Sequence, residues 1–201
     1  MNGTRLAFFI SGTGGNASNL LRACREGRVH AEPTIGVSSS TKAQGNERLR
    51  AEGLPVEVVT RSSFASDEAF SEACFRCVEG VDAEIICLCG WLKRLVVPDR
   101  WEGRILNIHP ALLPKFSGEG MYGMNVHRAV VAAREQESGC TIHLVDNHYD
   151  HGKILAQSRV PVLPGDTPEE VQKRVYEQEM RLYPEALMEF MRVFRPSFTR
   201  R

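Results

Sequence analysis

Short apolar runs alternate with longer amphipathic segments along roughly the first half of the chain. The apolar runs have the length and composition of buried strands, and they cover residues 6–10, 34–38, 56–60 and 84–89. The segments between them carry apolar residues at helical spacing, and they cover residues 20–26, 42–52 and 66–79. Strands that alternate with helices predict a mostly parallel sheet with helices on both faces, which is a doubly wound, Rossmann-like α/β fold.

The second half of the chain predicts a different kind of pairing. Residues 104–109 form one more apolar run, which ends at Pro110 because proline has no N–H for a strand ladder. After a helical segment at 125–134, the strand-like runs 140–145 and 154–160 have only a short loop between them. Two strands joined so closely must be antiparallel, and we therefore expect an antiparallel C-terminal extension of the sheet.

The last helix has a well-marked start and a predicted interruption. Thr167 and Glu170 match a capping box with proline at the first helical position, so a helix is expected from Thr167 to residue 182. Pro184 is expected to break or kink this helix before it resumes to about residue 194. No linker or repeat divides the sequence, which predicts a single domain over residues 1–201.

A glycine-rich segment at residues 11–19 connects the first strand to the first helix. We expect Ser18 or Asn19 to cap that helix, since both side chains accept hydrogen bonds from free helix N–H groups. A strand, a glycine-rich turn and a helix together place free N–H groups and a positive helix end at one point, which suits a phosphate group. The segment matches neither of the common nucleotide-binding motifs, and an ordinary tight turn is the alternative.

Two polar residues, Asn107 and His109, interrupt the apolar run at 104–109. Parallel sheets bind ligands at the carboxyl ends of their strands, which is where these residues fall. Side chains two residues apart point the same way from a strand, so the amide and the imidazole should face one site. The alternative is a hydrogen-bonded asparagine beside a histidine of the core.

Two further segments are expected near His109. Residues 90–95 follow the strand at 84–89 and carry one aromatic, two aliphatic and two cationic side chains. The loop at 114–124 is rich in glycine and methionine, and its residues 117–124 are long enough to form a mobile flap.

Charge and the N-terminus exclude some classes of function. Lys+Arg and Asp+Glu number 25 each, so the balance does not favour nucleic acid or an acidic membrane surface as a partner. The first apolar run is too short for a signal peptide or a membrane span, and we expect a cytoplasmic protein.

The six cysteines raise the question of a metal or redox site. Cys74 and Cys77 have C-x-x-C spacing, and Cys87 and Cys89 lie close after them. The first pair, however, falls on the apolar stripe of a predicted helix and the second in a buried strand. We therefore expect buried free thiols and no metal.

Four segments together resemble the phosphoribosylglycinamide formyltransferase family of folate-dependent enzymes. They are ISGTGGNASNL, ILNIHPALLPKF, HYDHGKILAQ and GDTPEEVQKRVYEQEMRLYP. The resemblance implies a formyltransferase fold with a phosphate-binding half at about 1–100 and a folate-binding and catalytic half at about 101–201. It implies transfer of a formyl group from 10-formyltetrahydrofolate to the amine of glycinamide ribonucleotide in de novo purine biosynthesis. The implied partners are these small molecules alone, with the protein a monomer or homodimer.

The resemblance also implies roles for individual residues. The catalytic residues would be Asn107, His109 and Asp150. The residues that bind the ribonucleotide would be Gly14, Gly15, Asn16, Tyr176, Glu177, Gln178 and Glu179. The residues that bind the folate would be Leu92, Lys93, Arg94, Leu95, Asn107, Asp146, Asn147, His148, Tyr149 and Asp150. In the phosphate loop, either Asn16 or Asn19 matches the family's asparagine.

Two alternatives remain at this point. One is another folate-dependent formyltransferase or a hydrolase of the formyl folate, since the Asn107, His109 and Asp150 set alone fits all of them. The other is a non-catalytic Rossmann-type nucleotide-binding module, in which His109 and Asp150 would lie more than about 10 Å apart.

Overall fold

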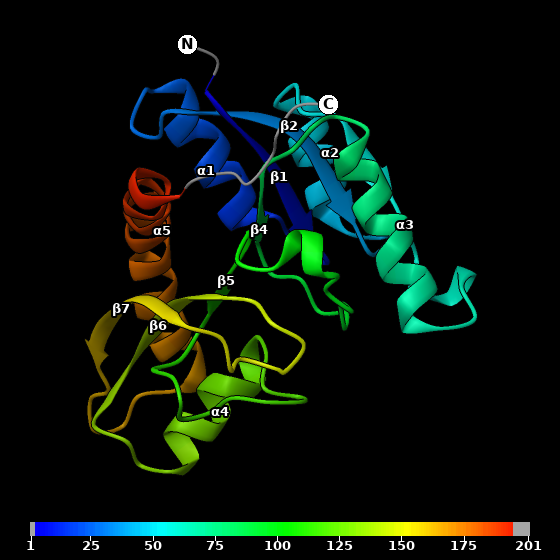
Figure 1. The fold of residues 1–201 in the computed structure, drawn as a ribbon. Helices are drawn as coiled ribbons and strands as arrows, with labels where there is room; N and C mark the ends of the chain where they lie inside the picture. The colour runs from blue at the N-terminus through cyan, green and yellow to red at the C-terminus, as the bar shows by residue number, and fades with distance from the viewer. Residues whose placement is uncertain (1–2, 195–201) are drawn as a thin grey trace.

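The computed structural model describes residues 3–194, which form one seven-stranded sheet with helices on both faces (Figure 1). The strands are β1 (Thr4–Ile10), β2 (Ala31–Ser38), β3 (Val56–Val58), β4 (Ile85–Leu88), β5 (Ile105–His109), β6 (Glu137–Leu144) and β7 (Ile154–Pro161). Their order across the sheet is β3-β2-β1-β4-β5-β6-β7. The first five strands pair in parallel, whereas β6 is antiparallel to both β5 and β7. The predicted parallel sheet with an antiparallel extension is therefore confirmed.

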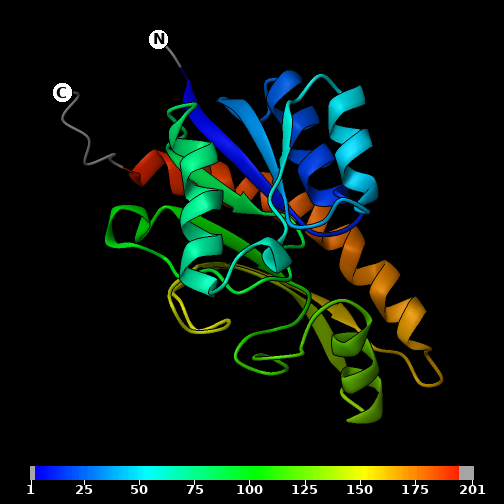
Figure 2. The same cartoon turned by 90° about the vertical axis from the view of Figure 1, so that its right-hand side faces the viewer.

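Five α-helices cover the sheet. They are α1 (Gly15–Arg25), α2 (Gln44–Ala51), α3 (Asp67–Glu79), α4 (Met124–Ala132) and α5 (Pro168–Val193), with short 3-10 turns at Arg61–Ser63 and Asp99–Trp101. Side chains of α1, α2 and α5 share one buried cluster with alternate residues of β1, and α3 packs on the opposite face. Figure 2 shows α3 on the side of the sheet away from α1 and α2. The predicted doubly wound arrangement is confirmed by these two clusters.

The start of α1 differs from the prediction. The helix begins at Gly15, and Gly14 is its N-cap with φ 70°, so neither Ser18 nor Asn19 is the cap. Glycine adopts this left-handed backbone conformation at no steric cost, which lets the chain turn directly from the strand into the helix. Asn19 is buried inside the helix instead, and its amide donates to the Met180 carbonyl at 2.8 Å.

Of the two outcomes expected at Pro184, the break is wrong, because α5 continues through it as one helix, and the kink stays a prediction. Pro184 has no N–H, so the Met180 carbonyl one turn earlier loses its usual helical partner. The Asn19 amide of α1 fills that position. A contact between two helices thus replaces the hydrogen bond that proline removes.

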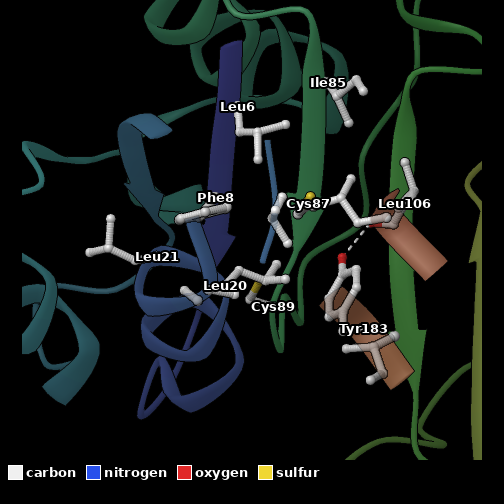
Figure 3. Packing of buried hydrophobic residues seen from close by; sticks show 14 of the residues in the cluster. Leu6, Phe8, Leu20, Leu21, Ile85, Cys87, Cys89, Leu106 and Tyr183 are labelled. Carbon is white, nitrogen blue, oxygen red and sulfur yellow. Dashed lines mark hydrogen bonds between the residues drawn. The ribbon is translucent and has the colours of Figure 1, made fainter. Parts of the chain in front are cut away.

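Tyr183 fixes α5 against the centre of the sheet (Figure 3). Its side chain is fully buried, and its hydroxyl lies 3.1 Å from the carbonyl oxygens of both Leu88 in β4 and Leu106 in β5. Glu179 precedes Tyr183 by one helical turn and therefore lies on the same face of α5. The register of α5 on the sheet thus determines where the Glu179 carboxyl is held.

Among the described residues, no helix combines the length and apolar character that crossing a bilayer requires.

Candidate active site

A cleft with a volume of about 770 Å³ runs along the carboxyl ends of β1, β4 and β5. Its lining includes the segments 12–16, 88–95, 107–110, 118–123 and 145–150, together with His127, His143, Gln172, Tyr176 and Glu179. The glycine-rich turn and the polar end of β5 therefore open into one continuous space, which the strand-end rule for parallel sheets predicts.

Four side chains form a polar cluster in this cleft: Asn107, His109, His143 and Asp150. His109 Nδ1 lies 3.4 Å from Asp150 Oδ1, and His143 Nε2 lies 3.7 Å from the same oxygen. Asn107 Nδ2 is 3.0 Å from His143 Nε2 across the β5–β6 pair, where the two residues are register partners. The histidines are almost fully buried and the Asp150 side chain is 12% exposed. In a non-catalytic module, His109 and Asp150 would lie more than about 10 Å apart. Their separation of 3.4 Å contradicts that alternative.

Hydrogen bonds define which nitrogen of each histidine carries a proton. His143 Nδ1 is 2.8 Å from the Leu144 carbonyl, so it donates there, and Nε2 accepts from the Asn107 amide. Burial lowers the pKa of His143, which favours this neutral form. His109 Nε2 donates to the Phe116 carbonyl at 2.8 Å, which leaves Nδ1 facing the Asp150 carboxylate.

The backbone that leads into the flap is attached to the polar cluster. The Phe116 carbonyl accepts from His109, and the Gly118 N–H donates to Asp150 Oδ2 at 3.0 Å. Phe116 and Gly118 both have positive φ, at 54° and 98°, which turns the chain sharply over the cluster. Asp150 also has positive φ, at 52°. Two backbone groups therefore restrain the orientation of the His109 and Asp150 side chains.

His127, at the start of α4, brings a third buried imidazole to the cleft, after His109 and His143. Burial, with a smaller contribution from His109, lowers its pKa to about 4, so it is neutral near pH 7. Its Nδ1 is buried and has no hydrogen-bond partner among the described residues. The sequence places His127 beside the apolar face of the helix expected at 125–134, where it was expected to cap or line the site, and it does line the cleft.

The opposite end of the cleft is built from backbone. No side chain caps α1 and no acidic residue lies in its first turn, so the first N–H groups of the helix remain available. A Cβ on Gly14 would lie 2.9 Å from the Gly45 Cα, and one on Gly15 would lie 2.3 Å from the Tyr176 hydroxyl oxygen. The glycines thus allow close packing against α2 and α5, and the positive helix end suits an anion.

One carboxyl group lies beside this helix end. Glu179 is 8% exposed, and its Oε2 accepts from Asn16 Nδ2 at 2.9 Å. Burial raises the pKa of Glu179 to about 7, although the Asn16 hydrogen bond acts in the opposite direction. Asn16 lines the cleft, whereas the Asn19 amide is used at Met180. Of the two asparagines, Asn16 is therefore the one that faces the cleft beside the free start of α1.

The remaining residues that the resemblance implied divide into two groups. The following line the cleft: Leu92, Lys93, Arg94, Leu95, Asp146, Asn147, His148, Tyr149 and Tyr176. Glu177 and Gln178 do not line it, and the Gln178 side chain instead accepts from the Ser158 hydroxyl at 3.1 Å. They lie beside Tyr176 and Glu179 in sequence, but successive helical residues point in different directions.

Five of the six cysteines lie outside the cleft lining, and Cys89, directly after β4, contributes to it. All six cysteines are free, and burial raises the pKa of Cys74 to about 12 and that of Cys87 still further. Buried, protonated thiols are poor nucleophiles and poor metal ligands.

Comparison with known proteins assigns the chain to a family. Residues 4–187 match the family model of the formyl transferases. The chloroplastic phosphoribosylglycinamide formyltransferase of Arabidopsis thaliana is 39% identical over 191 residues, which cover 91% of this chain and 64% of the relative. The chain spans about three fifths of the length of this relative and of the Vigna unguiculata protein of the same name.

This chain covers a larger share of two similar proteins whose structures have been solved. The crystal structure of phosphoribosylglycinamide formyltransferase from Brucella melitensis matches with a TM-score of 0.85 at 39% identity, covering 97% of this chain and 98% of that one. Glycinamide ribonucleotide transformylase 1 from Symbiobacterium toebii matches with a TM-score of 0.88 at 34% identity, covering 94% and 88%. The chain therefore belongs to the formyl transferase family.

Proposed function

We propose that the chain transfers a formyl group from 10-formyltetrahydrofolate to the amine of glycinamide ribonucleotide, a step of de novo purine biosynthesis. The observation that carries this proposal is the shared cleft, which holds the polar cluster at one end and the free start of α1 at the other. An acceptor with both a phosphate and an amine could use both ends at once. The names of the relatives support this choice of substrate.

Asn107 is suited to stabilise the charge that develops during transfer. Attack of the amine on the formyl carbon gives a tetrahedral intermediate with a negative oxygen. The Asn107 amide has two N–H donors, and only one of them is used at His143. The second is available to the oxygen, and His143 holds the amide in a fixed orientation for it.

His109 and Asp150 are suited to the proton transfers. The attacking amine must lose a proton and the folate nitrogen must gain one. A proton on His109 Nδ1, held by Asp150 Oδ1 at 3.4 Å, can be donated to the intermediate or passed on. Asp150, at the exposed side of the pair, can accept the proton of the amine directly or through water.

The two ligands would occupy different parts of the cleft. The start of α1, with Asn16 and Glu179, would bind the phosphate-bearing substrate. Folate is flat and largely apolar, so the segments 92–95 and 146–150 would line its site with aliphatic walls and backbone groups. Each site would therefore draw on both halves of the chain, since residues 92–95 precede residue 101 and Glu179 follows it.

A formyl-transfer assay with glycinamide ribonucleotide and 10-formyltetrahydrofolate tests the proposal directly. We expect formylated ribonucleotide and stoichiometric tetrahydrofolate. Formate release without a formylated product would indicate a hydrolase instead. Turnover only with an aminosugar or methionyl-tRNA as acceptor would assign the chain to another formyltransferase.

Leu92→Asp tests the folate site separately. Leu92 is 47% exposed in the cleft, so a charge there should weaken folate binding while leaving ribonucleotide binding intact. Leu163→Asp is a matched control, because Leu163 is 53% exposed and lies outside the cleft lining. Equal loss of both ligands in calorimetry of Leu92→Asp would contradict the proposed folate position.

The cytoplasmic compartment and the monomeric or homodimeric state remain predictions. Two relatives are named as chloroplastic proteins, so the relatives do not support the cytoplasm in particular.

A further inference from the structure

The loop between β6 and β7 brings together three potential metal ligands that the proposed transfer does not use as a set. One ligand atom from each of Asp146, His148 and His151 can be chosen so that all three lie within 4.8 Å of one another. His151 Nδ1 is 3.0 Å from Asp146 Oδ2, and His148 Nδ1 is 3.8 Å from Asp146 Oδ1. The two imidazole rings are 5.5 Å apart between centroids and meet edge to face.

These distances are close to those of a coordinated ion. In a tetrahedral site with bonds of about 2.0–2.1 Å, neighbouring ligand atoms lie roughly 3.4 Å apart. The histidine side chains are 78% and 73% exposed, so small rotations can shorten the longer distances without disturbing the core. A backbone hydrogen bond from the His148 N–H to Asp146 Oδ1, at 2.7 Å, already holds the loop in a tight turn around the carboxylate.

We propose that Asp146, His148 and His151 bind a divalent transition-metal ion at the rim of the cleft. Two imidazoles and one carboxylate favour zinc, nickel or copper over magnesium and calcium, which prefer oxygen ligands alone. Three protein ligands leave one position for water. This revises the expectation of no metal, which rested on the cysteines, since the ligands proposed here are two histidines and an aspartate.

The ion would connect the two ends of a segment that carries cleft residues. Asn147, Tyr149 and Asp150 lie between the ligands and line the cleft, and Asp150 belongs to the polar cluster. Coordination from Asp146 and His151 would therefore restrain the backbone on both sides of Asp150. Metal occupancy would reduce the mobility of this wall of the cleft.

Zinc titration of the intact protein, followed by calorimetry and by thermal unfolding, tests the proposal. We expect one zinc ion per chain and a rise in the unfolding temperature. His151→Ala should weaken zinc affinity by roughly tenfold or more, and Asp146→Asn should do the same while preserving the shape of the turn. His30→Ala is the control, because His30 is also exposed but lies in the loop before β2.

The variants keep all six cysteines, so they separate this site from adventitious binding to thiols. Equal zinc binding by the parent protein, His151→Ala and His30→Ala would overturn the proposal, as would no binding by the parent. Magnesium binding as tight as zinc binding would contradict the assigned metal class. Slower amide exchange of residues 146–151 with zinc is the expected sign of a restrained loop, and unchanged exchange would refute that consequence. None of these measurements depends on formyl transfer.

Discussion

The two ends of the cleft are constructed in different ways. At one end, called here the glycine end, the start of α1 offers backbone N–H groups. Gly14 and Gly15 are required there because a Cβ would collide with neighbouring atoms. At the other end, the polar cluster uses four side chains from two antiparallel strands and a loop. A backbone site should be sensitive to added atoms, and a side-chain site to removed functional groups. The variants below test this contrast, from the largest expected effect to the smallest.

Asp150→Asn should lower kcat by roughly 10³-fold with little change in either binding constant. Asparagine tolerates the left-handed backbone at this position and can still accept from the Gly118 N–H, so the fold should be retained. Steady-state kinetics with both substrates measures the effect. Near-normal kcat would show that the proton leaves by another route.

Combining Asp150→Asn with His109→Ala tests whether the cluster acts as a unit. The combined loss in kcat should be much smaller than the product of the two single losses, because each change already removes the shared proton path. Fully multiplicative losses would mean that the two groups act independently despite their 3.4 Å separation.

The glycine end is built mainly from backbone groups, but it also contains the titratable side chain of Glu179. Its pKa is raised from 4.5 to about 7 in the folded protein, so its contribution to stability is complete below pH 4.5 and is lost as the pH rises through 7. We expect ionisation of Glu179 to lower the free energy of unfolding by about 3 kcal/mol as the pH rises from 4.5 to 7. Denaturant unfolding across pH 4–8 measures it.

Glu179→Gln should flatten that part of the pH dependence and preserve the hydrogen bond from Asn16. Glu185→Gln is the control, because Glu185 is exposed on the same helix. The interpretation fails if Glu179→Gln and the parent protein lose stability equally over this range.

Gly14→Val should raise the KM for the phosphate-bearing substrate by roughly tenfold or more while changing kcat much less. Gly14 has φ 70° and would place its Cβ 2.9 Å from the Gly45 Cα. Gly27→Val is a close control, since Gly27 has φ 73° but no atom within 4 Å of an added Cβ. If both variants behave alike, the effect comes from backbone strain and not from the anion site.

The contact that positions α5 can be tested by a double-mutant cycle. Asn19→Ala should cost about 1–2 kcal/mol of stability, because the Met180 carbonyl then has no donor. Pro184→Ala restores a helical N–H to that carbonyl and should make Asn19→Ala cost less. Additive losses in the cycle would show that Asn19 acts by another contact.

Much of the fold follows from local sequence patterns. All seven strands and five α-helices were predictable, because apolar periodicity directly reports which residues face a core. The exceptions involve tertiary partners. Gly14 at the start of α1 packs against Gly45 of α2, and α5 passes through Pro184 with the Asn19 amide of α1 at the Met180 carbonyl, and no local window contains either partner.

The candidate site was only partly predictable. Asn107 and His109 were identifiable, since polar residues at a strand end carry a local signal. His143 has the same signal, a polar residue in an apolar strand, but its position opposite Asn107 depends on the β5–β6 register. His127 was expected from sequence to cap or line the site, whereas Gln172 lies on a helix surface whose orientation only the assembled fold determines. Glu177 and Gln178 were assigned by motif adjacency, although the helix turns them away from the cleft.

The attachment of the flap has an evolutionary consequence. The flap is held through the Phe116 carbonyl and the Gly118 N–H, which are backbone groups and do not depend on a particular side chain, although proline at position 118 would have no N–H to donate. Both anchors lie before the exposed tip around Tyr122. Insertions and substitutions beyond Gly118 can therefore accumulate without disturbing the anchors on His109 and Asp150. The length and composition of the tip are free to diverge among related proteins while the chemistry beneath it is preserved.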